Sequence, residues 1–135
     1  MNSQCILLFS SPAKYVSAAT AAQWTALVSE ARQQALLGSI YFLLKDLELL
    51  STVPQAVQAH LQTGFHYAEK QKNTLLQEML ELEQVFQSAE YPCILVKGVG
   101  YRLSGLAFGR GRIFSDIDLL IPHSAFADAL SRLLD

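Results

Sequence analysis

The chain has 135 residues, of which 51% are hydrophobic, and a formal net charge of −2. This size and composition allow one domain with a real core or parts of two small ones, and the charge argues against a nonspecific nucleic-acid binder held by a basic surface. The apolar run at residues 6–9 is too short for a signal peptide or a membrane span and lacks a basic flank. We therefore expect a soluble, cytoplasmic protein that does not enter a membrane.

The first 90 residues repeat apolar side chains at helical spacing. Four helices are expected there, at residues 3–9, 20–37, 40–50 and 55–88. Gly38-Ser39 is interpreted as a break or weak point between the second and third, and Val53-Pro54 as the start of the fourth. The aromatic and leucine positions of these helices are interpreted as core packing rather than as a ligand pocket.

The pattern changes near residue 91. The expected elements are a buried strand at 93–96, a short helix at 97–106, a turn at 108–112, a second strand at 116–121 and a helix from about residue 125. We therefore expect an α+β protein with a helical region at residues 1–90 and a smaller α+β region at residues 91–135.

Two aspartates, Asp116 and Asp118, lie in the second expected strand. Strand alternation places both on one face, with Cα atoms about 7 Å apart, and gives Ile117, Leu119 and Ile121 to the other face. Two carboxylates on one face repel each other unless a cation lies between them. For the pair alone, a metal site and chance placement on a solvated face are both open, although aspartate is depleted in strands.

The first strand runs into Lys97-Gly98-Val99-Gly100. These glycines serve either backbone geometry alone or the approach of backbone N–H groups to a phosphate; neither the P-loop nor the dinucleotide-binding pattern is present. Arg102, Arg110 and Arg112 follow before the acid pair, either as solubilising side chains or as phosphate contacts. Together, the glycines, the arginines and the acids favour a phosphate-and-metal pocket.

This combination resembles a known family. Leu95-Val96-Lys97-Gly98, Arg112 and the stretch Ser115-Asp116-Ile117-Asp118-Leu119-Leu120-Ile121 are similar to the core of the uncharacterised nucleotidyltransferase family, within the DNA polymerase β-like nucleotidyltransferase superfamily. The helical half is similar too, through Trp24-Thr25-Ala26-Leu27 and Val53-Pro54. The resemblance implies a helical N-terminal half followed by the start of a polymerase β-like core (strand, turn, helix, strand, helix), with two antiparallel strands and an incomplete sheet.

The resemblance also implies a chemistry. Such a protein transfers a nucleoside monophosphate from an NTP to a hydroxyl acceptor, which is unknown here and could be a protein, a small molecule or an RNA. Asp116 and Asp118 would be the catalytic carboxylates and would hold two Mg²⁺ ions about 3.5–4 Å apart. The residues expected to bind the triphosphate are Lys97, Gly98, Gly100, Arg112 and Ser115.

Members of this superfamily use a third carboxylate on a later strand, and this chain ends at Asp135. We therefore expect an N-terminal portion of a longer protein or a shortened relative. The alternative function is a catalytically inactive module that binds a nucleotide or a partner, as in toxin–antitoxin systems of the same fold. An exposed edge on so small a sheet predicts a homo-oligomer formed by strand pairing.

Overall fold

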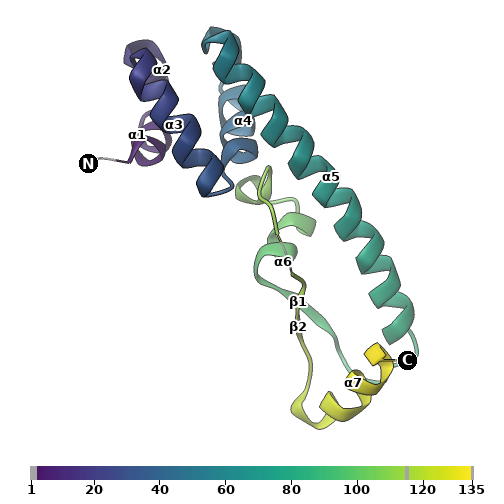
Figure 1. Cartoon of the computed structure of the whole chain (residues 1–135). Coiled ribbons are helices and arrows are strands. Elements are labelled where there is room, and N and C mark those ends of the chain that lie inside the picture. The colour runs from purple at the N-terminus through teal and green to yellow at the C-terminus, as the bar shows by residue number, and fades with distance from the viewer. Residues whose placement is uncertain (1–2, 115, 135) are drawn as a thin grey trace. The chain divides into compact units, whose positions relative to one another are not determined.

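The computed structural model describes residues 3–114 and 116–134 and divides into two compact units. Unit 1 comprises Met1–Glu69 and Arg110–Ile113, and unit 2 comprises Lys70–Gly109 and Phe114–Asp135. The described residues combine helices with a small antiparallel sheet, which agrees with the expected α+β class (Figure 1). None of the described helices is both long enough and apolar enough to cross a bilayer.

Unit 1 is helical. Its elements are α1 (Gln4–Ser10), α2 (Pro12–Ala18), α3 (Ala21–Gln33), α4 (Leu37–Asp46), the 3-10 helix η1 (Leu50–Thr52) and the first part of α5 (Gln55–Phe86). The short first helix and the long helix after Pro54 are confirmed. α2 was not predicted. It begins with Pro12 in its first turn, where proline needs no N–H partner.

The predicted break at Gly38-Ser39 is wrong. The chain leaves α3 at Gln33 and turns at Ala35, whose φ of +56° is left-handed, and α4 has already begun at Leu37. Gly38 is buried within the first turn of α4. The glycine is required there by packing, as described below, and it does not interrupt a helix.

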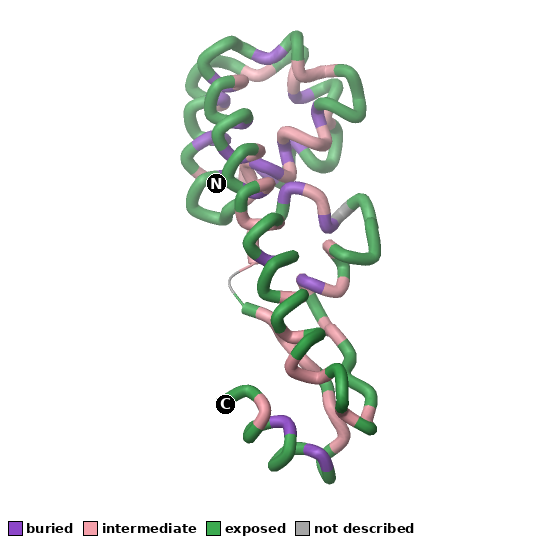
Figure 2. Tube along the Cα trace, turned by 90° about the vertical axis from the view of Figure 1, so that its right-hand side faces the viewer, coloured by how far each residue is buried: buried purple, intermediate pink, exposed green. Residues whose placement is uncertain are grey.

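The core of unit 1 is built from the apolar faces of its helices (Figure 2). The largest side chains with almost no exposed surface in this unit are Leu8, Leu27, Ile40, Leu44 and Leu61. Tyr15 meets the indole of Trp24 edge-on, with ring centroids 5.3 Å apart. Thr20 starts α3 with a capping box in which its hydroxyl accepts from the backbone N–H of Gln23. Burial of these side chains supplies most of the favourable free energy of folding of this unit.

Glu30 of α3 caps the start of α1. Its carboxylate accepts hydrogen bonds from the Ser3 hydroxyl and from the backbone N–H groups of Gln4 (2.8 Å) and Cys5 (3.3 Å). These N–H groups have no partner within α1. The hydroxyl bond, followed by the backbone bonds, lowers the pKa of Glu30 from its ordinary value of 4.5. Burial and then the nearby Glu30 charge raise the pKa of the Cys5 thiol to about 11.

Three glycines bring backbone segments of unit 1 into direct contact. A Cβ added to Gly111 would lie 2.2 Å from the carbonyl carbon of Gly38, and one added to Gly38 would lie 2.5 Å from the carbonyl oxygen of Gly111. At Gly64 of α5, an added Cβ would lie 2.9 Å from the Gly38 nitrogen. The turn at residues 110–113 therefore packs on α4 and α5 at a distance that only glycine permits.

The arginine of this turn holds it in place. Arg110 forms an ion pair with Asp46 at 2.7 Å, and its guanidinium lies 4.3 Å from the ring centroid of Phe42. Phe42 in turn packs edge-on against Phe65, at 5.6 Å between centroids. Cation–π and charge contacts of this kind add about 0.5–1 kcal/mol each at exposed sites. Arg110 therefore has a structural role in unit 1.

Unit 2 contains the sheet. Its elements are the second part of α5, β1 (Ile94–Val96), α6 (Lys97–Leu103), the 3-10 helix η2 (Ala107–Gly109), β2 (Asp118–Leu120), the 3-10 helix η3 (His123–Ala125) and α7 (Phe126–Leu134). The strands pair antiparallel, as expected, with Ile94 opposite Leu120, Leu95 opposite Leu119 and Val96 opposite Asp118. The predicted second strand, residues 116–121, was too long at both ends.

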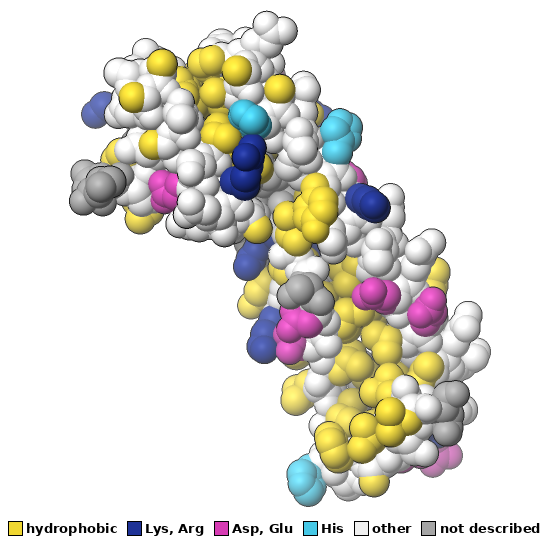
Figure 3. Space-filling model, in the orientation of Figure 1, with side chains coloured by type: hydrophobic (Ala, Val, Ile, Leu, Met, Phe, Trp, Pro, Cys, Tyr) yellow, Lys and Arg dark blue, Asp and Glu magenta, His cyan; other side chains and the backbone are white. Residues whose placement is uncertain are grey.

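The two faces of this sheet differ. Leu95 and Leu119 face the second part of α5 and line an apolar groove of about 720 Å³ with side chains such as Met79 and Phe86. Ile94 and Leu120 are about half exposed, and hydrophobic side chains gather on this part of unit 2 (Figure 3). Oligomerisation through the sheet stays a prediction.

The glycine contact makes a prediction that reverses helix propensity. Alanine in a helix is normally more stable than glycine by about 1 kcal/mol. Gly38→Ala and Gly111→Ala should instead each lower the free energy of unfolding of unit 1 by about 2–4 kcal/mol, because the new methyl group meets backbone atoms. Urea denaturation followed by fluorescence of Trp24, the single tryptophan, measures this change.

Gly105→Ala is the matched control. Gly105 has a left-handed backbone, with φ +73°, as Gly111 does with φ +72°. An added Cβ at Gly105 meets no atom within 4 Å, and the residue belongs to unit 2. This variant should leave the Trp24 transition unchanged. A Gly38→Ala transition equal to that of the wild type would contradict the packing described above.

Glu30 predicts an acid-sensitive contribution to stability. Because folding lowers the pKa of this carboxyl below 4.5, its stabilising effect is complete above that value and is lost as the pH falls through the folded-state pKa. Glu30→Gln should therefore destabilise unit 1 at pH 7 and lose less further stability than the wild type between pH 5 and about pH 3. Urea midpoints of the two proteins, measured across this pH range, give the two pH dependences of stability. Parallel pH dependences would show that protonation of Glu30 does not contribute to stability.

Candidate active site

Lys97 stands at the junction of β1 and α6. Val96 ends the strand in extended conformation, and Lys97 then has a φ of +58°, in the left-handed region. A residue other than glycine in that backbone conformation costs about 1–2 kcal/mol relative to the right-handed helical conformation. Val99, two residues later in α6, is buried, and α6 contacts β1. The fold of unit 2 thus holds a lysine in a backbone conformation that glycine would adopt more cheaply.

The lysine side chain reaches the acid-bearing strand. Its Nζ lies 3.2 Å from Oδ1 of Asp118, which is the first residue of β2 and pairs across the sheet with Val96. The Lys97 side chain is 74% exposed and that of Asp118 is 34% exposed. An ion pair this open to solvent adds only about 0–1 kcal/mol to stability, so both groups stay accessible to a ligand.

The two glycines of the turn have structural reasons to be glycine. A Cβ at Gly98 would lie 2.3 Å from atoms of the Phe114 ring, which packs over this residue. A Cβ at Gly100 would lie 3.2 Å from the carbonyl oxygen of Leu95, closer than most side chains tolerate. Both glycines therefore bring α6 close to its neighbours. This explanation accounts for their identity without a phosphate, whose binding here stays a prediction.

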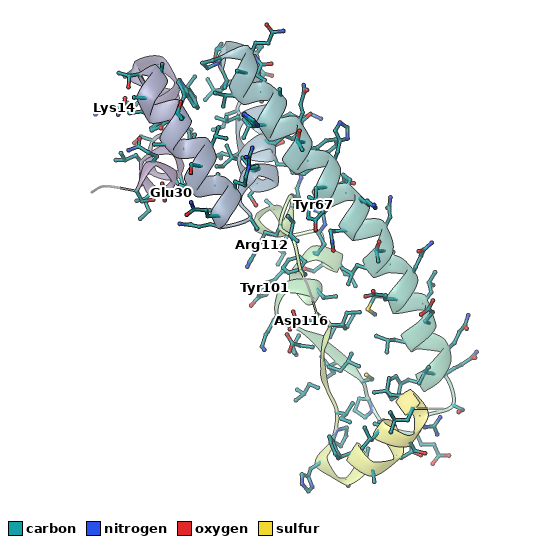
Figure 4. The ribbon with its side chains drawn as sticks, viewed as in Figure 1. Lys14, Glu30, Tyr67, Tyr101, Arg112 and Asp116 are labelled. Atoms are coloured by element: carbon teal, nitrogen blue, oxygen red, sulfur yellow. The ribbon has the colours of Figure 1, made fainter. Side chains whose placement is uncertain are left out.

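The acid pair straddles the start of β2. Asp116 lies on the segment before the strand and is exposed (Figure 4), and Asp118 is the first strand residue. Ile117, Leu119 and Ile121 are half-buried, but Asp118 is half-buried as well, so burial does not separate the two expected sets of side chains. Ser115, the remaining predicted residue of this motif, lies outside the described residues. The placement of Asp116 and Asp118 on one face therefore stays a prediction.

The predicted site residues fall into both units. Lys97, Gly98, Gly100 and both aspartates belong to unit 2, where Lys97 and Asp118 are in contact. Arg112 is exposed and belongs to the turn of unit 1, next to the structural Arg110. Its role with a nucleotide therefore stays a prediction.

The donor chemistry suits a hard divalent cation. Asp116 and Asp118 offer carboxylate oxygens, and Mg²⁺ is commonly bound through one or two carboxylates together with substrate phosphates. Among residues 3–114 and 116–134, no group of three or more His, Cys, Asp or Glu side chains is arranged to hold a metal ion. Lys97 is paired to one of the two aspartates, and their role as metal ligands stays a prediction.

Phe114 was missed by sequence reasoning. Its ring fixes the closest approach of Gly98 and so of the turn that carries Lys97. The only signal in the sequence was an aromatic residue two positions before Asp116, and such a residue indicates ordinary core packing. Only the tertiary contact reveals that it shapes the turn.

The backbone at Lys97 gives a prediction that is independent of activity. Lys97→Gly and Lys97→Ala both remove the ammonium group, but only glycine tolerates the left-handed φ. We expect the glycine variant to be more stable than the alanine variant by about 1 kcal/mol, opposite to the order for an ordinary helix position. Hydrogen–deuterium exchange at β1 and α6 measures the difference, and greater protection in the alanine variant would refute the assigned conformation.

Comparison with known proteins adds a family. The model of a family described as uncharacterised nucleotidyltransferase matches residues 20–135, which include α3 to α7 and both strands. No curated protein matches the chain. No solved structure matches it either. The family match extends over most of the chain and includes the acid pair, the lysine–glycine turn and the helices before them, so this protein belongs to the uncharacterised nucleotidyltransferase family.

Proposed function

We propose that the protein is a metal-dependent nucleotidyltransferase that moves a nucleoside monophosphate from an NTP to a hydroxyl acceptor. Family membership supports nucleotidyl transfer in general. The observation that carries the finer proposal is the contact between Lys97 at the strand–helix turn and Asp118 on the neighbouring strand. A cation for phosphate and a carboxylate for metal thus meet at the same end of the two-stranded sheet.

The reaction is a displacement at phosphorus. The acceptor oxygen forms a bond to the α-phosphorus, the bond from that phosphorus to the oxygen bridging the β-phosphate breaks, and pyrophosphate leaves with the bonding electrons. The hydroxyl proton passes to water. Bound Mg²⁺ would supply Lewis-acid stabilisation of the attacking and leaving oxygens, and Asp116 and Asp118 are the residues that would hold it.

The remaining predicted residues position the triphosphate. Lys97 would offset phosphate charge from its exposed place on α6, and Arg112 would do so with a planar guanidinium. Gly98 and Gly100 would offer backbone N–H donors, and Ser115 a hydroxyl. This set is the phosphate side of a polymerase β-like core, and the antiparallel strands with an acid opposite the residue before the turn support that fold.

Isosteric substitution of the acids tests the proposal. Asp116→Asn and Asp118→Asn keep the side-chain volume but remove the charge that binds a metal. Label from α-³²P NTPs should enter the acceptors of a cell extract in the presence of wild-type protein and Mg²⁺, and each variant should reduce this by about 100-fold or more. Glu78→Gln, which neutralises an exposed carboxylate on α5, should label as the wild type does.

The same proteins also test the alternative function, a non-catalytic binding module. Equal labelling by wild type, Asp116→Asn and Asp118→Asn would remove the aspartates from the active site. Calorimetric binding of Mg²⁺ and a nucleotide without any labelling by the wild type would instead support the non-catalytic binding module. The two functions thus give different results with one set of proteins.

A further inference from the structure

The ion pair between Lys97 and Asp118 is unusual for the site in which it lies. Asp118 is one of the two carboxylates that the proposed site offers to a metal, and the ammonium of Lys97 lies 3.2 Å from it. A divalent ion that binds Asp118 must therefore displace this ammonium or bind beside it. Displacement costs the ion pair, and binding beside the ammonium brings like charges close together, so either arrangement weakens binding of the metal by itself.

The lysine can leave its partner without disturbing the fold. Its side chain is 74% exposed, and its backbone is fixed by the strand on one side and by the buried Val99 on the other. Lysine carries its charge on a flexible stem of four carbons with three donors. The ammonium can therefore turn from the carboxylate to another anion within reach while Lys97 stays at the start of α6.

We infer that Lys97 is an internal counter-ion of Asp118 that a nucleotide phosphate draws away, so that the metal and the nucleotide bind cooperatively. This inference rests on the proposed function. In the absence of nucleotide, the ammonium neutralises Asp118 and keeps a divalent ion weakly bound. When a triphosphate is present, its oxygens take the ammonium, and Asp118 is released to the metal. The coupling is reciprocal, because a ligand that favours one arrangement is favoured by it in turn.

Metal binding without nucleotide tests the inference. Mn²⁺ is titrated calorimetrically into wild type and Lys97→Met, which keeps the apolar stem and removes the charge. We expect Lys97→Met to bind Mn²⁺ alone about two- to five-fold more tightly, as loss of an exposed ion-pair competitor predicts. The same variant should bind a non-hydrolysable NTP analogue, at saturating Mn²⁺, about tenfold more weakly.

Two variants control for charge and folding. Lys97→Arg keeps a cation at the turn and should bind Mn²⁺ alone as the wild type does. Lys70→Met removes the same charge from an exposed position of α5 in unit 2 and should change neither affinity. A gain in Mn²⁺ affinity by Lys70→Met equal to that of Lys97→Met would trace the effect to net charge and overturn the inference.

Asp118→Asn separates this inference from the function on which it rests. If Asp118→Asn abolishes Mn²⁺ binding but Lys97→Met leaves the affinity unchanged or weaker, the metal site stands and the counter-ion role is overturned. If Asp118→Asn does not reduce Mn²⁺ binding, the metal site of the proposed function fails, and the counter-ion role fails with it.

Discussion

Backbone contact among Gly38, Gly64 and Gly111 is the constraint on which unit 1 depends. It joins α4, α5 and the turn at residues 110–113, and it leaves no room for a side chain at any of the three positions. Arg110 reinforces the contact through Asp46 and Phe42. The glycine- and arginine-rich turn before the acid pair is therefore explained first by packing. Within that turn, a phosphate contact is proposed for Arg112, because Arg110 has a structural role.

In unit 2, by contrast, Lys97 has an unfavourable backbone conformation. Lys97 occupies a left-handed backbone position at the end of β1, and its ammonium gains only an exposed ion pair with Asp118. An exposed ion pair contributes about 0–1 kcal/mol, which is less than the cost of about 1–2 kcal/mol for the left-handed backbone. Local strain of this kind concentrates at functional sites, where the surrounding structure holds it in place. Phe114 against Gly98 and the buried Val99 provide that support here. The backbone strain, the exposure and the charge of Lys97 therefore support the proposed site, in agreement with membership of the family.

Sequence reasoning succeeded where one local signal dominated. The apolar stripe after Pro54 predicted α5 to within two residues of its end, and the change of period near residue 91 predicted the two strands. It failed where tertiary contact decides. Gly38 resembles a helix breaker by propensity, but its neighbours across the fold require it inside α4. For Arg110 a solubilising role and a phosphate contact were both open, and its partner Asp46, 64 residues away in sequence, was not predicted. The candidate site was predicted by resemblance to a family, and the Lys97–Asp118 contact was not, because no pattern in a single sequence links residues 21 positions apart in this way.

The proposed function requires that a divalent metal and a nucleotide bind at Asp116 and Asp118, beside Lys97. Paramagnetic broadening of backbone amide signals by substoichiometric Mn²⁺, in the presence of a non-hydrolysable NTP analogue, locates the metal directly. We expect selective broadening at residues 97–100 and 116–119 in the wild type, and its loss when both aspartates are replaced by asparagine. Broadening centred on the acidic residues of α5 or on Asp128, unchanged by those replacements, would contradict it.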